Sequence, residues 1–212
     1  MPIDESLKNY VETVVLPRYE AFDRGHDRTH VERVIAESLA LAQNYDVDIN
    51  MVYVVAAYHD VGLPQGREQH HIYSAQLLLA DKNLRRWFSE ANLRLMAEAI
   101  EDHRASGSRS PRSIYGCIVA EADRDITPEL ILRRTLRFSL RQQPDATAEW
   151  HIQRAVAHLH EKYAEGGYLH LWLHSAKNER GLADLRALIA NETALHQQLR
   201  KFFDEETSDN VA

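Results

Sequence analysis

Apolar residues recur along almost the whole chain at the three- and four-residue spacing of an amphipathic helix. In the first half, this pattern predicts helices over residues 5–22, 29–45, 51–60, 70–82, 90–104 and 113–124. In the second half, it predicts helices over residues 129–141, 147–163 and 179–205. Pro17 should kink or break the first helix. We therefore expect an all-α fold.

Two segments depart from ordinary amphipathic helices. Residues 51–60, MVYVVAAYHD, are apolar on most sides, which predicts a buried central helix that ends before Gly62. Residues 168–173, YLHLWL, are too short to assign to a strand or to a turn of buried helix. The glycine pair 166–167 before them allows a hinge. This segment either covers a cleft of the helical core as a lid or plugs the base of the bundle.

Composition narrows the class of protein. A length of 212 residues suits one domain, or one core with a helical appendage. The single cysteine excludes an internal disulfide framework and a multi-cysteine zinc site. A net charge of -7 predicts no tight binding to a nucleic-acid polymer. No signal peptide and no bilayer-length apolar run are visible, so we expect no membrane partner and a cytoplasmic location. The sequence leaves homo-oligomerisation open.

Four ionisable side chains lie inside apolar patterns. His59 and Asp60 end the most hydrophobic helix, and a buried aspartate is costly unless it is paired or binds a metal. His30 lies beside the core-facing Val31, and Asp123 lies in the apolar stretch IYGCIVAEADR. Such imidazole and carboxylate groups suit Mn, Fe, Zn, Co or Ni better than calcium. The alternative is a buried polar network without a metal.

The order of these residues resembles a known motif. His30, the pair His59-Asp60 and then Asp123 are similar to the H…HD…D series of the HD superfamily of metal-dependent phosphohydrolases. The flanks GHDRTHVERV (25–34), AAYHDVG (56–62) and EADR (121–124) resemble that family as well. Asp125 departs from it, because many relatives carry a leucine there. The resemblance implies one HD-type domain over residues 1–212, with a five-helix metal-binding core over 20–127 and a helical extension over 128–212 packed on it.

The resemblance also implies a metal site and its ligands. The first ion, a divalent Mn, Fe, Co, Ni, Zn or Mg, would be held by His30, His59, Asp60 and Asp123. In two-metal members of the family, histidines at the places of His71 and His103 bind a second ion, with the aspartate of the HD pair as the bridge. His70 competes with His71 for this role. The alternative for His71 and His103 is an ordinary surface or capping position.

The activity implied by the resemblance is hydrolysis of a phosphate monoester or diester in a nucleotide or another small phosphorylated substrate. Asp60, or a carboxylate near it, would orient or deprotonate the attacking water. Arg33 lies one turn after His30, and Arg104 follows His103, so both are candidates for catalysis and for phosphate binding. Arg124, after Asp123, is a third phosphate-binding candidate. Each of these arginines has a plain alternative as a solvated or salt-bridged side chain.

Residues outside the ligand motifs also have candidate roles, and two other functions are possible on this scaffold. The arginines in loops between the motifs are candidates to close over a substrate: Arg28, Arg67, Arg109 and Arg112. His26 and Asp27 are expected to cap or orient the first ligand helix. One rival function is a di-iron oxygenase on the same scaffold, and the other is a non-catalytic module that binds a metal or a nucleotide.

Overall fold

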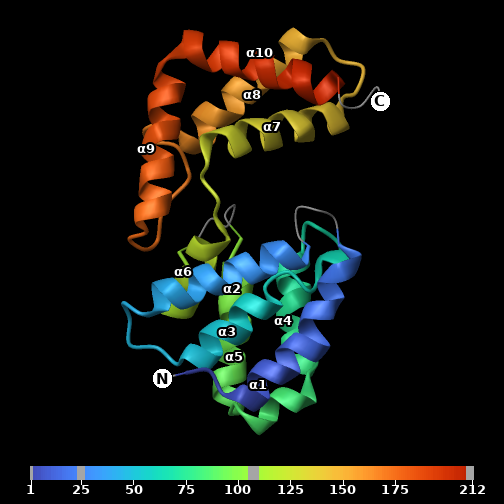
Figure 1. Ribbon diagram of the computed structural model, residues 1–212, viewed down its shortest axis with the longest axis vertical. Coiled ribbons are helices and arrows are strands. Elements are labelled where there is room, and N and C mark those ends of the chain that lie inside the picture. Colours follow the sequence, from blue (N-terminus) through green and yellow to red (C-terminus); the bar gives the residue numbers. More distant parts are fainter. Residues whose placement is uncertain (1, 23–26, 105–109, 209–212) are drawn as a thin grey trace. The chain divides into compact units, whose positions relative to one another are not determined.

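The structure is a computed structural model, and it describes residues 2–22, 27–104 and 110–208. The chain divides into two compact units, Met1–Arg124 and Asp125–Ala212 (Figure 1). Each unit has a hydrophobic core of its own. Every regular element in the described stretches is a helix, which confirms the all-α fold class. The expected packing of residues 128–212 on the metal-binding core stays a prediction.

The first unit is a bundle of helices joined by short helical turns. Its α-helices are α1 (Glu5–Tyr10), α2 (Arg28–Ala42), α3 (Ile49–Tyr58), α4 (His70–Ala80), α5 (Glu90–Asp102) and α6 (Ile114–Asp123). Between them lie the π-helical η1 (Val11–Val15) and the 3-10 turns η2 (Leu16–Ala21), η3 (Leu63–Gln65) and η4 (Lys82–Arg86). The predicted first helix is therefore interrupted at Val11, where the π-helix begins, before the chain reaches Pro17.

Helix α3 is the buried centre of this unit, as its apolar sequence predicts. Its residues from Met51 to Tyr58 are all buried, and it packs against α2, α5 and α6. After α3 the chain turns sharply at Gly62 into the approach to α4. A Cβ atom on Gly62 would lie 2.5 Å from the backbone oxygen of His70 and 2.5 Å from the backbone nitrogen of Ser74. The missing side chain thus allows the end of α3 to approach the start of α4 closely.

The N-terminal segment belongs to the same unit and supports the end of α3. Leu7, Val11 and Tyr19 are fully buried in its core. The Tyr19 hydroxyl donates a hydrogen bond to the Ala57 carbonyl at 3.0 Å and accepts one from the Asp60 N–H at 3.3 Å. The structural unit consequently begins well before residue 20, where the sequence resemblance places the start of the core.

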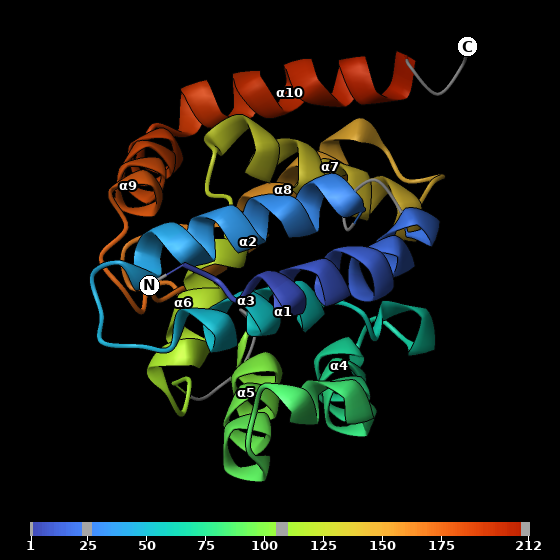
Figure 2. The same cartoon turned by 60° about the horizontal axis from the view of Figure 1, so that its bottom comes forward.

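The second unit contains α7 (Pro128–Gln142), α8 (Ala148–Tyr163), α9 (Ala176–Ala190) and α10 (Glu192–Ser208). Helix α10 packs on α7 and α8 (Figure 2). The prediction of one helix over 179–205 is wrong, because the chain leaves helical geometry at Asn191 (φ -99°, ψ 81°). The Asn191 side chain then accepts a hydrogen bond from the Ala194 N–H at 3.1 Å, and so caps α10.

The undecided segment over residues 168–173 forms neither a helix nor a strand. Gly166, just before it, has φ +78°, a conformation that glycine adopts without strain. Leu169 is buried in the core of the second unit, and Leu171 packs partly against that core. These two apolar side chains are therefore covered within their own unit. The lid role stays a prediction.

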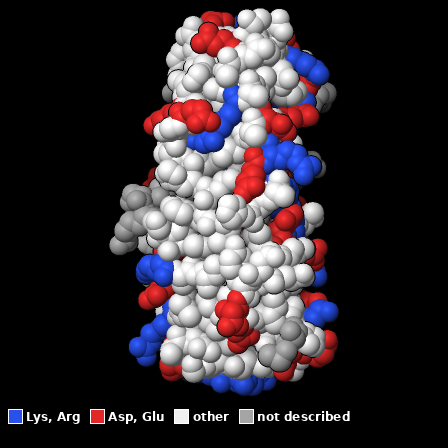
Figure 3. Space-filling model, turned by 90° about the vertical axis from the view of Figure 1, so that its left-hand side faces the viewer, with Lys and Arg blue, Asp and Glu red and all other residues white. Residues whose placement is uncertain are grey.

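Two surface properties bear on partners. Within the described stretches, no helix is both long enough and apolar enough to cross a membrane. On the face drawn in Figure 3, basic and acidic side chains are interspersed among uncharged ones, and the lysines and arginines form no continuous strip.

Candidate metal centre

The structure brings together the four residues that the sequence groups as first-ion ligands. His30 lies in the first turn of α2, His59 and Asp60 directly follow α3, and Asp123 ends α6. The Nε2 atoms of His30 and His59 are 3.2 Å apart. Asp60 Oδ2 lies 3.6 Å from the first of these nitrogens and 3.3 Å from the second. Asp123 Oδ1 lies 3.3 Å from His30 Nε2 and 3.9 Å from His59 Nε2.

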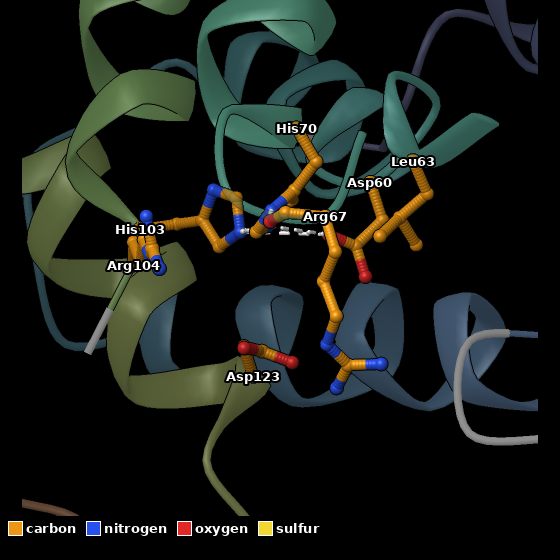
Figure 4. A pocket seen from close by; sticks show the side chains of 7 residues that line it. All are labelled: Asp60, Leu63, Arg67, His70, His103, Arg104 and Asp123. Carbon is orange, nitrogen blue, oxygen red and sulfur yellow. Dashed lines mark hydrogen bonds and ion pairs between the residues drawn. The ribbon is translucent and has the colours of Figure 1, made fainter. Parts of the chain in front are cut away.

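A second group forms around the other oxygen of the same aspartate. Asp60 Oδ1 lies 3.2 Å from His70 Nε2 and 3.5 Å from His103 Nε2. The two imidazole nitrogens are 3.1 Å apart. Figure 4 shows both rings directed at Asp60, with Asp123 across the pocket. Asp60 is thus shared between two groups of ligands, each large enough to hold a metal ion.

The histidine favoured by the sequence for the second group, His71, does not join it. Its neighbour His70 does, because adjacent residues on a helix point about 100° apart and only one of them can face Asp60. His71 instead has a buried Nδ1 atom that makes no hydrogen bond in the described structure. Burial, followed by the charges of His103 and His70, lowers the pKa of His71 to about 4. The sequence shows the pair but not which member turns inward.

Backbone hydrogen bonds fix the tautomer of three of these rings. In His59, His70 and His103, the Nδ1 atom lies 2.6–2.7 Å from the carbonyl oxygen of the residue three positions earlier. A carbonyl only accepts hydrogen bonds, so Nδ1 carries the proton and the Nε2 lone pair points into the cluster. Histidines that ligate metals are held in this way.

The spacing of the donor atoms fits a divalent cation. Two lone pairs on nitrogens 3.1–3.2 Å apart repel each other unless a proton or a cation lies between them. Ligand atoms about 2.1 Å from one ion lie about 3.0 Å apart at a right angle and about 3.4 Å apart at a tetrahedral angle. Imidazoles with carboxylates are the donors that first-row transition metals accept. The cluster is therefore suited in both chemistry and spacing to hold a metal.

Protonation within the cluster reflects the same charge pattern. Burial lowers the pKa of His30, but hydrogen bonds and charge from Asp123 and Asp60 outweigh it and raise the pKa to about 9. Burial raises the pKa of Asp123, but the hydrogen bond from His30 and the charge of His59 hold it well below its usual range. The pKa of Asp60 is also well below its usual range, since the nearby imidazoles overcome the effect of its burial. A divalent cation would take the place of the His30 proton.

Arg33 has a different role in the structure from the phosphate contact that the sequence suggests. Its guanidinium donates hydrogen bonds to the carbonyl oxygens of Ala122 and Asp123, at 3.0 and 3.1 Å. A third contact, at 3.4 Å, reaches Nδ1 of His30. Arg33 thereby ties the end of α6 to α2 and positions two of the candidate ligands.

Of the other two arginine candidates, Arg104 lines the pocket and Arg124 does not. Arg124 is buried and forms an ion pair with the buried Glu121 at 2.6 Å, so its charge is neutralised away from the pocket. Arg104 lines the pocket and donates a hydrogen bond to the Glu68 carbonyl. Arg67, from the loop before α4, also lines the pocket, and its side chain extends across it toward the side of Asp123 (Figure 4). Only its loop position between two motifs signalled Arg67 in the sequence.

The remaining loop candidates lie elsewhere. Arg28 forms ion pairs with Glu20 and Glu32, and Arg112 forms them with acidic residues at the end of α5. Asp27 accepts a hydrogen bond from the His30 N–H at 3.1 Å, which confirms its capping role. His26 and Arg109 lie outside the described residues.

One protein family matches the part of the chain that holds this cluster. Residues 28–127 match the family model for the HD domain, and this stretch contains every residue of the cluster. The chain also resembles the crystal structure of a predicted HD superfamily hydrolase from an uncultured Thermotogales bacterium. That likeness covers 89% of this chain and 87% of the other, with 17% sequence identity and a TM-score of 0.48. No curated protein matches the sequence.

Proposed function

We propose that this chain, whose residues 28–127 match the HD domain, is a divalent-metal-dependent phosphohydrolase of the HD superfamily. The substrate would be a nucleotide or another small phosphate ester. The observation that carries the proposal is the buried Asp60 carboxylate between two groups of histidines, at the floor of an open pocket. A cation pair on one carboxylate suits hydrolysis of a phosphoester, where both the attacking and the leaving oxygen carry charge.

The ligands divide between the two groups. One ion would be held by His30, His59, Asp60 and Asp123, and a second by Asp60, His70 and His103. When bound, such ions lower the pKa of water and neutralise charge on phosphate oxygens. Asp123 lines the pocket with 32% of its side chain exposed, whereas Asp60 is enclosed by imidazoles. Asp123 is therefore better placed than Asp60 to accept a hydrogen bond from the attacking water.

Positive side chains at the mouth of the pocket would bind the phosphate. Arg67 and Arg104 both line it, and a guanidinium offers paired N–H groups that match two phosphate oxygens. Arg33 acts indirectly in this proposal, by holding the end of α6 where Asp123 emerges.

The decisive experiment is elemental analysis of the purified protein, followed by a screen of nucleotides and small phosphate esters with added Mn, Co, Ni, Mg or Zn. His59→Ala should lose bound metal and turnover together. His196→Ala, an exposed histidine on α10, is the matched control and should change neither. Stoichiometric metal retained by the double variant His59→Ala/Asp60→Ala would refute the ligand assignment.

A di-iron oxygenase is the second candidate, favoured by the same shared carboxylate between two histidine groups. The two candidate functions differ in the metal that they require and in the co-substrate that they consume. Iron as the bound metal, with oxygen uptake and no phosphate release, would establish the oxygenase. Bound metal without either reaction would leave a metal- or nucleotide-binding module.

A further inference from the structure

The second unit has a pocket of its own between α7 and α8, and its walls are basic and aromatic. Along α8, the side chains of Arg154, His158 and Lys162 line it at four-residue spacing, and so share one face of the helix. Arg134 and Phe138, also four residues apart, line it from α7. None of the lining residues is acidic. In a chain of net charge -7, this is a local reversal of sign.

Two arginines of this pocket, Arg134 and Arg154, differ in their pairing from the arginines on the neighbouring face of α7. Arg133 and Arg137 form ion pairs with Glu206 of α10. Across the described stretches, no acidic side chain lies within ion-pair distance of Arg134 or Arg154. Arg154 and Lys162 lie two helical turns apart on α8 and line the pocket together with Arg134 from α7.

Two further features describe what would fit. Phe138 is 48% exposed, and the Arg154 guanidinium lies over its ring, 5.2 Å from the centroid. The pKa of His158 is lowered by burial and by the charges of Lys162 and Arg154, partly offset by Glu161. The pocket therefore combines basic side chains with a partly exposed aromatic ring, which are the two elements that bind a phosphate and a planar ring.

We propose that the pocket between α7 and α8 binds a small organic phosphate that carries a planar ring, of the mononucleotide class. Arg134, Arg154 and Lys162 bind the phosphate, and Phe138 stacks against the ring. All of these residues belong to the second unit, so the site is distinct from the metal centre and does not depend on the proposed hydrolysis.

The test is calorimetric titration with AMP, adenosine and inorganic phosphate. It uses the full chain carrying Asp60→Asn, which removes the shared metal ligand and prevents turnover. AMP should bind saturably, and more tightly than either fragment. Arg154→Gln/Lys162→Gln should weaken AMP at least about tenfold, since each lost contact is a charged hydrogen bond. Arg141→Gln, an exposed arginine of α7 outside the pocket, should leave AMP affinity unchanged.

Further variants keep the outcome unambiguous. Arg134→Gln replaces one exposed side chain and should weaken AMP without lowering the melting temperature, which guards against misfolding of the double variant. Phe138→Ala should weaken AMP about fivefold or more and leave inorganic phosphate unaffected. Absence of saturable binding at millimolar AMP would overturn the proposal. So would AMP binding that is unchanged in Arg154→Gln/Lys162→Gln, because the nucleotide would then bind elsewhere.

Discussion

Arg33 offers the sharpest distinction between a positioning residue and a substrate contact. It is half-buried, and its guanidinium donates to the two carbonyl oxygens at the end of α6. Replacement by alanine leaves both carbonyls without this donor. Hydrogen bonds to a charged group contribute about 1.5–3 kcal/mol each, and partial exposure favours the lower value. We expect Arg33→Ala to lower the free energy of unfolding by about 2–4 kcal/mol.

The same substitution should weaken metal binding. Asp123 directly follows one of the two carbonyls that Arg33 holds, and loss of a group that orients a metal ligand typically costs 10- to 100-fold in affinity. Arg33→Lys keeps the charge but loses the forked geometry, so it should recover only part of this loss. The measurements are urea unfolding of the metal-free protein and titration with Mn or Zn.

Arg28→Ala is the matched control, because Arg28 lies on the same helix and its ion pairs are exposed. It should change neither measurement. If Arg33→Lys keeps full stability and full metal affinity while the KM for a phosphate ester rises, the reasoning is refuted. Arg33 would then contact the substrate directly, as its place one turn after His30 suggests.

Three other predictions follow from the site and its surroundings. Since the pKa of His30 is raised to about 9, protonated His30 stabilises the metal-free fold fully below about pH 6.5, and this contribution is lost as pH rises through 9. Metal affinity should show the opposite trend, rising about tenfold per unit up to about pH 9 as one proton is displaced, and a flat profile in calorimetry would contradict this. His70→Ala should lower metal content from about two per chain toward one by elemental analysis, whereas His71→Ala should leave it unchanged; the reverse result would restore the sequence-based assignment. Arg124→Ala should lower the free energy of unfolding by about 3–5 kcal/mol, because it leaves the Glu121 charge buried without this partner, and a variant with normal stability but a raised KM would return Arg124 to the substrate pocket.

Much of this architecture follows from local sequence pattern. The spacing of apolar residues predicts the all-α class and the buried α3. The candidate first-ion ligands are ionisable residues in apolar segments, where burial without a partner costs free energy. The two inferences about helices succeed because burial imposes the same requirement on every chain, whereas the ligand roles stay predictions. The break at Asn191 was missed because the apolar spacing continues across it, although an asparagine before an acidic first turn is a capping signal.

What the sequence could not supply is the direction of side chains at helix ends. His70 and His71 are the same residue type at adjacent positions, and the start of α4 alone decides which of them faces Asp60. The arginines present the same difficulty. Arg33 and Arg124 follow the ligand motifs closely, yet backbone carbonyls and a buried glutamate engage them. Arg67 reaches the pocket from a loop, where periodicity carries no information.

The contact between Tyr19 and the end of α3 limits how this protein can be dissected. Tyr19 precedes the stretch that matches the HD domain, yet its hydroxyl bonds the backbone on both sides of His59. A fragment that starts at residue 28 would lack this hydroxyl, and it would expose the core surface that Leu7 and Val11 cover. The stretch that matches the HD domain, residues 28–127, is therefore shorter than the stretch that builds the core around the metal centre. A design that moves the metal-binding stretch into another scaffold would also need to include the N-terminal helical segment that covers this core.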